Sequence, residues 1–278
     1  MIRYEGFVTI DGREFLDGTE PKGLPPGVYV PASVWKPGVK LPPNTKLSAV
    51  PGLIQQGAAI AGFSAALHAK PEEKRKFWEC SVADELLSVN GTKTGRAVLE
   101  ELRTLGAQVE IKPARDLTSS GALGDGKAQC QPKDDGRMRF SPGVMSYTAG
   151  IGLTWIGAPP YRADEVLLHE LFHKARQAAG KACVLKTFNE WDNREEFYAI
   201  LVTNICRSER GSALLRGSHR PRFEMLQDDA ATVAQRHNID LFVLKEDMPV
   251  LWKKLAAVPG RFNPVREWVR QEELTKVA

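Results

Sequence analysis

The sequence has little of the chemistry that marks several classes of protein. Its 278 residues contain only four cysteines, and no two of them form a CxxC pair. This excludes a small disulfide scaffold and gives no support to a thiol metal site or a redox motif. Free thiols and two disulfides remain equally open for Cys80, Cys130, Cys183 and Cys206. With 42% hydrophobic and 26% charged residues, the chain is neither a disordered tail nor a collagen-like fibre.

An excess of charge of one sign is also missing. Lys and Arg number 38 against 34 Asp and Glu, which leaves a net charge of only +4. Proteins that bind nucleic acids usually carry a larger and more clustered basic excess. We therefore expect no nucleic-acid partner.

Long hydrophobic runs are absent as well. The most apolar stretch, residues 52–69, contains Gln55, Gln56, Ser64 and His68, and is too short and too polar for a membrane span. The first 15 residues carry charges where a secretory signal has an apolar core. We expect neither a membrane span nor a cleavable signal peptide.

Proline is concentrated near the N-terminus, where eight of the 18 prolines lie between residues 21 and 51. Because proline blocks long helices, residues 1–70 are predicted to form a Pro-rich N-terminal arm or adaptor region, and residues 71–278 the domain that carries the chemistry. Periodicity and end signals predict further elements. Helices are expected over residues 71–89, 94–105, 164–179, 193–206 and most of 222–278, with breaks at Asn238, Pro249 and Pro259, and strands over 108–111, 137–140 and 144–155.

A glycine-rich segment, residues 121–128, nearly matches the phosphate-binding loop G-x-x-x-x-G-K-[ST]. Ala128 stands where a hydroxyl should hold magnesium, and Pro132 follows where a helix should begin. We interpret this segment as a surface loop without nucleotide chemistry.

One motif does carry chemistry: residues 169–173 read H-E-x-x-H. Side chains four positions apart on a helix lie about 40° apart around the axis, so His169 and His173 project together and can hold one Zn²⁺. Glu170 lies about 100° further round, beside the metal, where a base for a zinc-activated water belongs. A helix with two partly buried histidines is the alternative interpretation.

A catalytic zinc needs a third protein ligand, and the following helix offers Glu195 and Glu196. Asp192 and Glu195 have the spacing of a capping box, which would give Glu195 a structural role. Glu196 shares its face with apolar residues, where a carboxylate is costly unless it is paired or metal-bound. Glu196 is thus the predicted third ligand and Glu195 the fallback, while Tyr198 is expected to point away and to pack.

The motif and its surroundings resemble a known group of enzymes. H-E-x-x-H followed by Glu-Phe-Tyr-Ala from Glu196 resembles the gluzincin branch of zincin metallopeptidases. More narrowly, residues 166–176, 195–205 and 208–219 are similar to bacterial effector metallopeptidases, which include toxin domains of type VI secretion systems. The resemblance covers about residues 94–264, with its specific matches within 141–219.

The resemblance implies a zinc metalloendopeptidase that is secreted as an effector toxin without a cleaved signal and acts in a rival or host cell, including the periplasm of a target cell. Its partners would be a protein or peptide substrate, an immunity protein and a component of the secretion apparatus. Two alternatives use the same site: a zinc-stabilised binding protein that cuts nothing, and an amidase acting on cell-wall peptides.

The expected architecture is α+β and zincin-like: a twisted β-sheet packed on the H-E-x-x-H helix, a second helix that supplies Glu196, and a helical C-terminal part.

An oxyanion that forms during the reaction needs a hydrogen-bond donor besides zinc. His219 is the candidate, with an ordinary surface histidine as the alternative. Residues 145–155 are placed at the sheet edge that binds substrate, or in a buried hairpin. The local excess of arginine is interpreted as a solvated face, with an anionic-substrate contact as the alternative. It comprises Arg207, Arg210, Arg216, Arg220 and Arg222.

Overall fold

The protein is seen here in a computed structural model. The residues that it describes are 8–10, 13–14, 82, 85–112, 128–129, 137–140, 162–182, 191, 193–218 and 225–277.

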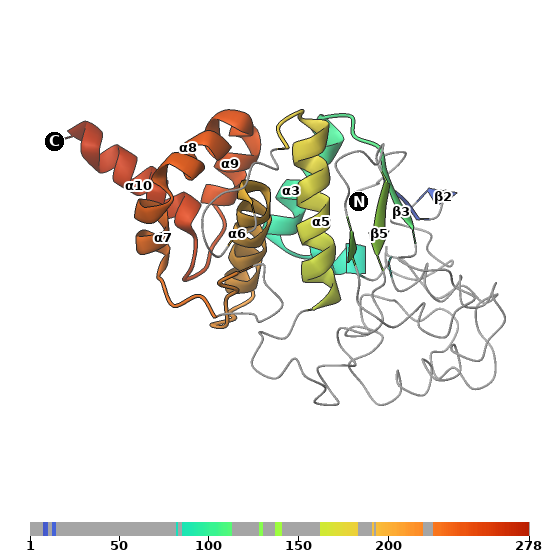
Figure 1. Cartoon of the computed structure of the whole chain (residues 1–278), viewed down its shortest axis with the longest axis horizontal. Coiled ribbons are helices and arrows are strands. Elements are labelled where there is room, and N and C mark those ends of the chain that lie inside the picture. Colours follow the sequence, from blue (N-terminus) through green and yellow to red (C-terminus); the bar gives the residue numbers. More distant parts are fainter. Residues whose placement is uncertain are drawn as a thin grey trace, which may run out of the picture. The chain divides into compact units, whose positions relative to one another are not determined.

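The chain divides into two compact units. The first contains the strands, residues 85–88 and the first turn of the helix that carries H-E-x-x-H, up to Leu167. The second contains Val89–Ala107 and Leu168–Ala278, and therefore most of the helices (Figure 1). The chain combines helices with a small sheet and is therefore α+β, as predicted. The zincin-like packing of the sheet on the H-E-x-x-H helix and a domain boundary at residue 70 stay predictions.

The sheet of the first unit is small and has a parallel centre. Its order is β2-β1-β3-β5-β4, in which β3 pairs parallel with β1 and β5, and the outer strands β2 and β4 pair antiparallel. In the central strand, Val109 and Ile111 are buried and alternate with the half-buried Glu110 and Lys112, the pattern of a strand with one apolar face. The strands are β1 (Val8–Ile10), β2 (Arg13–Glu14), β3 (Val109–Lys112), β4 (Ala128–Gln129) and β5 (Arg137–Phe140).

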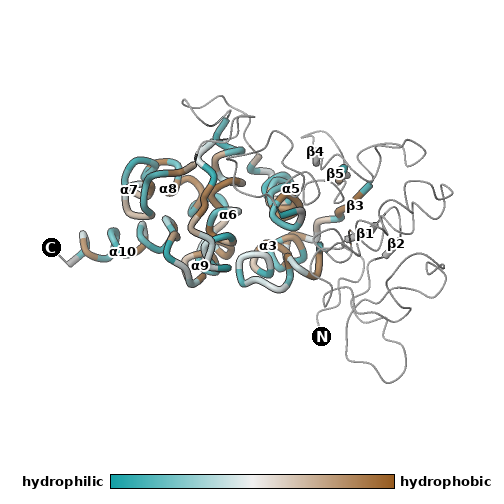
Figure 2. The backbone as a smooth tube through the Cα atoms, turned by 90° about the horizontal axis from the view of Figure 1, so that it is seen from below, coloured by the Kyte–Doolittle hydropathy of each residue, from teal (hydrophilic) through white to brown (hydrophobic). Residues whose placement is uncertain are grey.

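The second unit is helical and has its core around one helix, α6. Helix α6 is buried on almost every side from Phe197 to Ser208, as befits a helix enclosed by others, and Figure 2 shows the hydrophobic residues along it. The helices are α3 (Lys93–Thr104), α5 (Ala163–Ala178), α6 (Arg194–Glu209), α7 (Ala230–Arg236), α8 (Asn238–Asp247), α9 (Pro249–Ala256) and α10 (Pro264–Val277).

The end of α6 is joined to the beginning of α3 by side-chain capping. Glu209 accepts hydrogen bonds from the backbone N–H groups of Lys93 and Thr94, at 2.6 and 3.0 Å, and from the Thr94 hydroxyl at 2.8 Å. A carboxylate at a helix N-terminus satisfies N–H groups that lack partners within the helix and favours the positive end of its dipole. The contact thus fixes two core helices against each other.

Most predicted ends in this unit are confirmed. Gly106 and Gly180 follow their helices with φ of 64° and 68°, the left-handed conformation in which glycine ends a helix. The C-terminal part breaks between α8 and α9 at Met248, directly before the Pro249 predicted as a break, and after α9, where Pro259 was predicted to end it. Strand 108–111 corresponds to β3, shifted by one residue.

Other expectations have mixed outcomes. Ala128, the last residue of the glycine-rich segment, begins strand β4, and residues 121–127 lie outside the described residues. Strand β5 pairs with β3 and β4. Residues 144–155, the predicted hairpin and substrate edge, and almost all of the Pro-rich arm lie outside the described residues. Within the described part of the chain, no helix combines the length and apolarity needed to cross a membrane.

Gly95 in α3 offers a test of this packing. An added Cβ at Gly95 would lie 1.9 Å from the Val89 carbonyl oxygen, so the backbone would have to move. We expect Gly95→Ala to lower the free energy of unfolding by about 1–3 kcal/mol, although alanine is the better helix former. Urea unfolding measures the loss, with Arg103→Ala on the exposed face of α3 as a control expected to stay within about 0.5 kcal/mol. Equal stability of Gly95→Ala and the parent would contradict the close approach of Val89.

Candidate metal centre

Helix α5 presents its two histidines from a firmly buried position. Acidic Asp164 and Glu165 occupy its first turn, where they favour the positive end of the helix dipole. Between and around the histidines, Leu168, Leu171 and Phe172 are fully buried. The apolar packing fixes the rotation of the helix about its axis, and with it the direction in which the histidines point.

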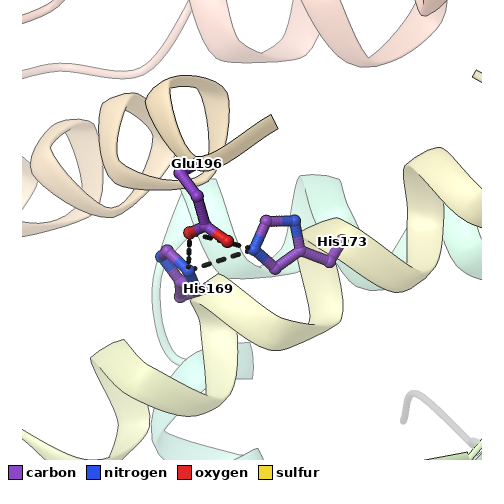
Figure 3. A group of neighbouring side chains, drawn as sticks. All are labelled: His169, His173 and Glu196. Atoms are coloured by element: carbon purple, nitrogen blue, oxygen red, sulfur yellow. Dashed lines mark hydrogen bonds and ion pairs between the residues drawn. The ribbon is translucent and has the colours of Figure 1, made fainter. Parts of the chain in front are cut away.

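The structure brings together the three predicted ligands (Figure 3). His169 Nε2 lies 3.0 Å from Glu196 Oε2 and 3.1 Å from His173 Nε2, and His173 Nε2 lies 3.5 Å from Glu196 Oε2. Two nitrogens from α5 and one oxygen from α6 thus face a single point.

These separations match those of zinc ligands. Bonds of about 2.0–2.1 Å at tetrahedral angles separate ligand atoms by about 3.3 Å. The observed distances of 3.0, 3.1 and 3.5 Å bracket this value without any movement of the helices. Two imidazoles and one carboxylate with an open fourth position are also the donor set of catalytic zinc sites. The residues therefore fit the ion.

Without a cation, the same atoms compete for protons. Burial lowers the pKa of His169 to about 4, and the neighbouring His173 and Arg216 add to this, against the opposing effect of Glu196. Burial also acts to lower the pKa of His173, but Glu195 and Glu196 outweigh it and raise that pKa to about 10. Burial acts to raise the pKa of Glu196, and the two histidines reverse this and hold it far below its usual range. One proton, on His173, is thus held where a metal would bind.

Glu196 lies beside the two histidines as predicted, but not for the reason that the sequence indicated. The expectation was that α6 has one inward face that contains Glu196, whereas α6 is buried nearly all round, and the Glu196 side chain is 20% exposed against 7% for Glu195. The cap also differs: Asn193 caps α6 and accepts the N–H of Glu196 at 2.9 Å, so the predicted capping box of Asp192 and Glu195 is wrong. The cap places Glu196 in the first turn, level with the histidines.

Glu170, the predicted base, is buried on α5. Its charge contributes to the raised pKa of His173, so its carboxylate acts on the same cluster. It is not one of the three groups whose ligand atoms converge. The role of Glu170 as a base stays a prediction.

Sequence reasoning missed a buried ion-pair network behind His173. Arg176 is fully buried, and its Nε donates to both carboxylate oxygens of Glu195 at 2.8 and 3.0 Å. Its Nη2 donates to Asp247 at 3.1 Å and to the Lys181 carbonyl at 2.6 Å. A signal was present in the sequence: an arginine three residues after the second histidine, on the same helix, needs an acidic partner if it is buried.

Tyr198 packs, as predicted. Its ring lies under the Arg176 guanidinium, 4.8 Å from ring centroid to Cζ, and its hydroxyl donates to the Asp240 carbonyl at 2.7 Å. Burial raises the pKa of Tyr198 above its usual value. Tyr198 therefore stays neutral, and its ring packs against the guanidinium of the ion-pair network.

The arginine-rich segment is only partly a surface. Arg207 is buried and donates to the Leu214 carbonyl at 2.8 Å, so the prediction of a solvated face is wrong for this residue. Arg216 is half-buried, and Asn204 of α6 holds its backbone by two hydrogen bonds at 2.8 and 2.9 Å. Arg216 thereby brings a positive charge that acts on the pKa of His169. His219, Arg220 and Arg222 lie outside the described residues, so the oxyanion role of His219 stays a prediction.

A cavity of about 140 Å³ also borders α6, and the three cluster residues are not among those that line it. Its walls combine apolar residues with amide and charged side chains. They include Trp191, Phe197, Leu201, Asn204, Asp228 and Arg236.

Comparisons of the chain with protein-family models, with curated proteins and with solved structures found no match. The resemblance to gluzincins and to secreted effectors therefore stays a prediction.

The cluster predicts how many protons zinc displaces. At pH 7.5 the metal-free protein should carry a proton on His173, whose pKa is about 10, and none on His169, whose pKa is about 4. We expect zinc to release one proton from His173, to which an ionising zinc-bound water would add, and the apparent affinity to rise about tenfold or more per pH unit between pH 6.5 and 8.5. Calorimetry in buffers of different ionisation heat counts the protons, and His237→Gln, outside the cluster, should leave the count unchanged. A count of zero would contradict the proton on His173.

Proposed function

We propose that the protein is a zinc-dependent peptidase in which His169, His173 and Glu196 hold the metal. The observation that carries the proposal is the convergence of three ligand atoms from two helices at separations of 3.0, 3.1 and 3.5 Å, close to those in a tetrahedral zinc site. A bound zinc ion would act as a Lewis acid and lower the pKa of a water at its open position.

Glu170 has the chemistry and the placement of the general base. It follows His169 directly on α5, so its side chain leaves the helix about 100° away from that ligand, beside the metal. It would accept the proton of the attacking water and deliver it to the leaving amine of the peptide. The Glu170 charge that acts on His173 supports this position.

Paired variants test the proposal. Glu170→Gln should keep one zinc per chain and lose cleavage of a denatured protein substrate by a factor of about 10² or more, because only proton transfer is removed. His169→Ala and Glu196→Ala should lose both zinc and cleavage, because each removes a ligand. Metal analysis of the purified protein and a fluorescent casein assay measure the two properties.

The outcomes separate the alternatives. A parent that binds zinc but cleaves neither protein nor peptidoglycan is the zinc-stabilised binding protein, and one that cleaves isolated peptidoglycan alone is the cell-wall amidase. Full zinc content in Glu196→Ala would remove Glu196 from the ligand set and overturn the proposal.

The biological setting we propose is that of a secreted effector toxin, supported by the resemblance of residues 166–176, 195–205 and 208–219 to bacterial effector metallopeptidases. The parent chain should arrest growth when it is directed to the compartment of a bacterium that contains its substrate, and Glu170→Gln should not. Growth curves with cytoplasmic and periplasmic versions of both chains measure this. Equal toxicity of the two chains would contradict a proteolytic toxin.

A further inference from the structure

Glu195 lies behind the metal centre, on the side of His173 that faces away from the other ligands. Its Oε1 is 3.8 Å from His173 Nδ1, whereas His173 Nε2 faces His169 and Glu196. An imidazole that binds metal through Nε2 carries its proton on Nδ1, and an acceptor at Nδ1 fixes both the tautomer and the plane of the ring. Glu195 Oε1 lies at ion-pair distance from Nδ1, beyond the length of a hydrogen bond, so it favours the Nδ1 proton through its negative charge.

Arg176 determines the orientation of the Glu195 carboxylate. Its Nε contacts both carboxylate oxygens at 2.8 and 3.0 Å, and both side chains are buried, with exposures of 0% and 7%. Hydrogen bonds to Asp247 and to the Lys181 carbonyl hold the far side of the guanidinium. Such a network has little freedom to rotate, because each of its contacts would be lost in a buried setting.

The same ion pair gives the adjacent residues Glu195 and Glu196 different partners. Glu195 and Glu196 both lie in the first turn of α6, and either carboxylate could bind zinc by its chemistry. The Arg176 guanidinium occupies both oxygens of Glu195, while Oε2 of Glu196 faces the two histidines. The charge of Arg176 therefore favours metal binding by Glu196 alone.

We propose that Glu195 is a positioning residue for His173, and that the buried Arg176 ion pair holds it in that role and out of the coordination shell. The proposal rests on the proposed zinc site and goes beyond it by assigning the groups that orient a ligand. Glu195 is not a catalytic residue in this account, since it acts only through His173.

Zinc affinity, measured by competition with a chromophoric chelator, tests the proposal. Glu195→Gln keeps the shape of the side chain and removes its charge, and we expect a loss of affinity of about 10- to 100-fold. The absorption spectrum of the cobalt-substituted protein should change as well, because the His173 ring is less firmly oriented. Asp247→Asn is the matched control: it removes the other carboxylate on Arg176, leaves His173 untouched, and should change the affinity by less than about threefold.

A second variant removes the risk that a buried arginine with Asp247 as its remaining ionic partner prevents folding. The double variant Glu195→Gln/Arg176→Met removes both charges of the pair, which buried sites tolerate far better than the loss of one. It should fold, as its circular dichroism and unfolding midpoint will show, and should still bind zinc about 10- to 100-fold more weakly.

Three results would overturn the proposal. The first is parental zinc affinity and an unchanged cobalt spectrum in both Glu195 variants, which would leave the peptidase proposal intact. The second is an equal loss in Asp247→Asn, which would assign the effect to the network as a whole. The third is a parent chain without zinc affinity, which would remove the metal site itself. Zinc binding without peptidase activity, in contrast, would remove only the proposed function.

Discussion

The side chains of His169, His173 and Glu196 direct three electron-donating atoms at one place between α5 and α6. The packing of the neighbouring residues has to hold these atoms together. Two imidazole nitrogens and a carboxylate oxygen, at 3.0 to 3.5 Å from one another, need a cation between them, either protons or a metal. In the metal-free state a proton on His173 meets the need. A zinc ion would meet it more completely, because it accepts from all three groups at once.

The surroundings keep this unfavourable arrangement in place. Apolar packing fixes the rotation of α5, the Asn193 cap fixes the first turn of α6, and the link between Glu209 and the start of α3 ties α6 to its neighbour. Behind His173, the buried ion pair of Arg176 and Glu195 joins α5 to α6. Buried charges of this kind are costly unless paired, and in this network Glu195 and Asp247 both pair with Arg176.

The sequence predicted the features that are determined within a single helix, and it predicted few of the contacts that depend on how two helices pack. The joint projection of His169 and His173 follows from helix geometry, and the ends of helices at Gly106 and Gly180 follow from the conformational freedom of glycine. The approach of Glu196 to the histidines was expected, but the amphipathic argument for it fails, because α6 is enclosed on nearly all sides. The partnership of Arg176 with Glu195 depends on the packing of two helices and could not be read from either one alone.

X-ray absorption spectroscopy at the zinc edge tests the central claim most directly, because it reports the ligand atoms of the bound ion. The account predicts one zinc per chain, two imidazole nitrogens and a carboxylate oxygen at about 2.0–2.1 Å, and a light-atom fourth ligand. A shell that contains sulfur at about 2.3 Å, or one with a single imidazole, would contradict the assignment of His169, His173 and Glu196 as the metal centre.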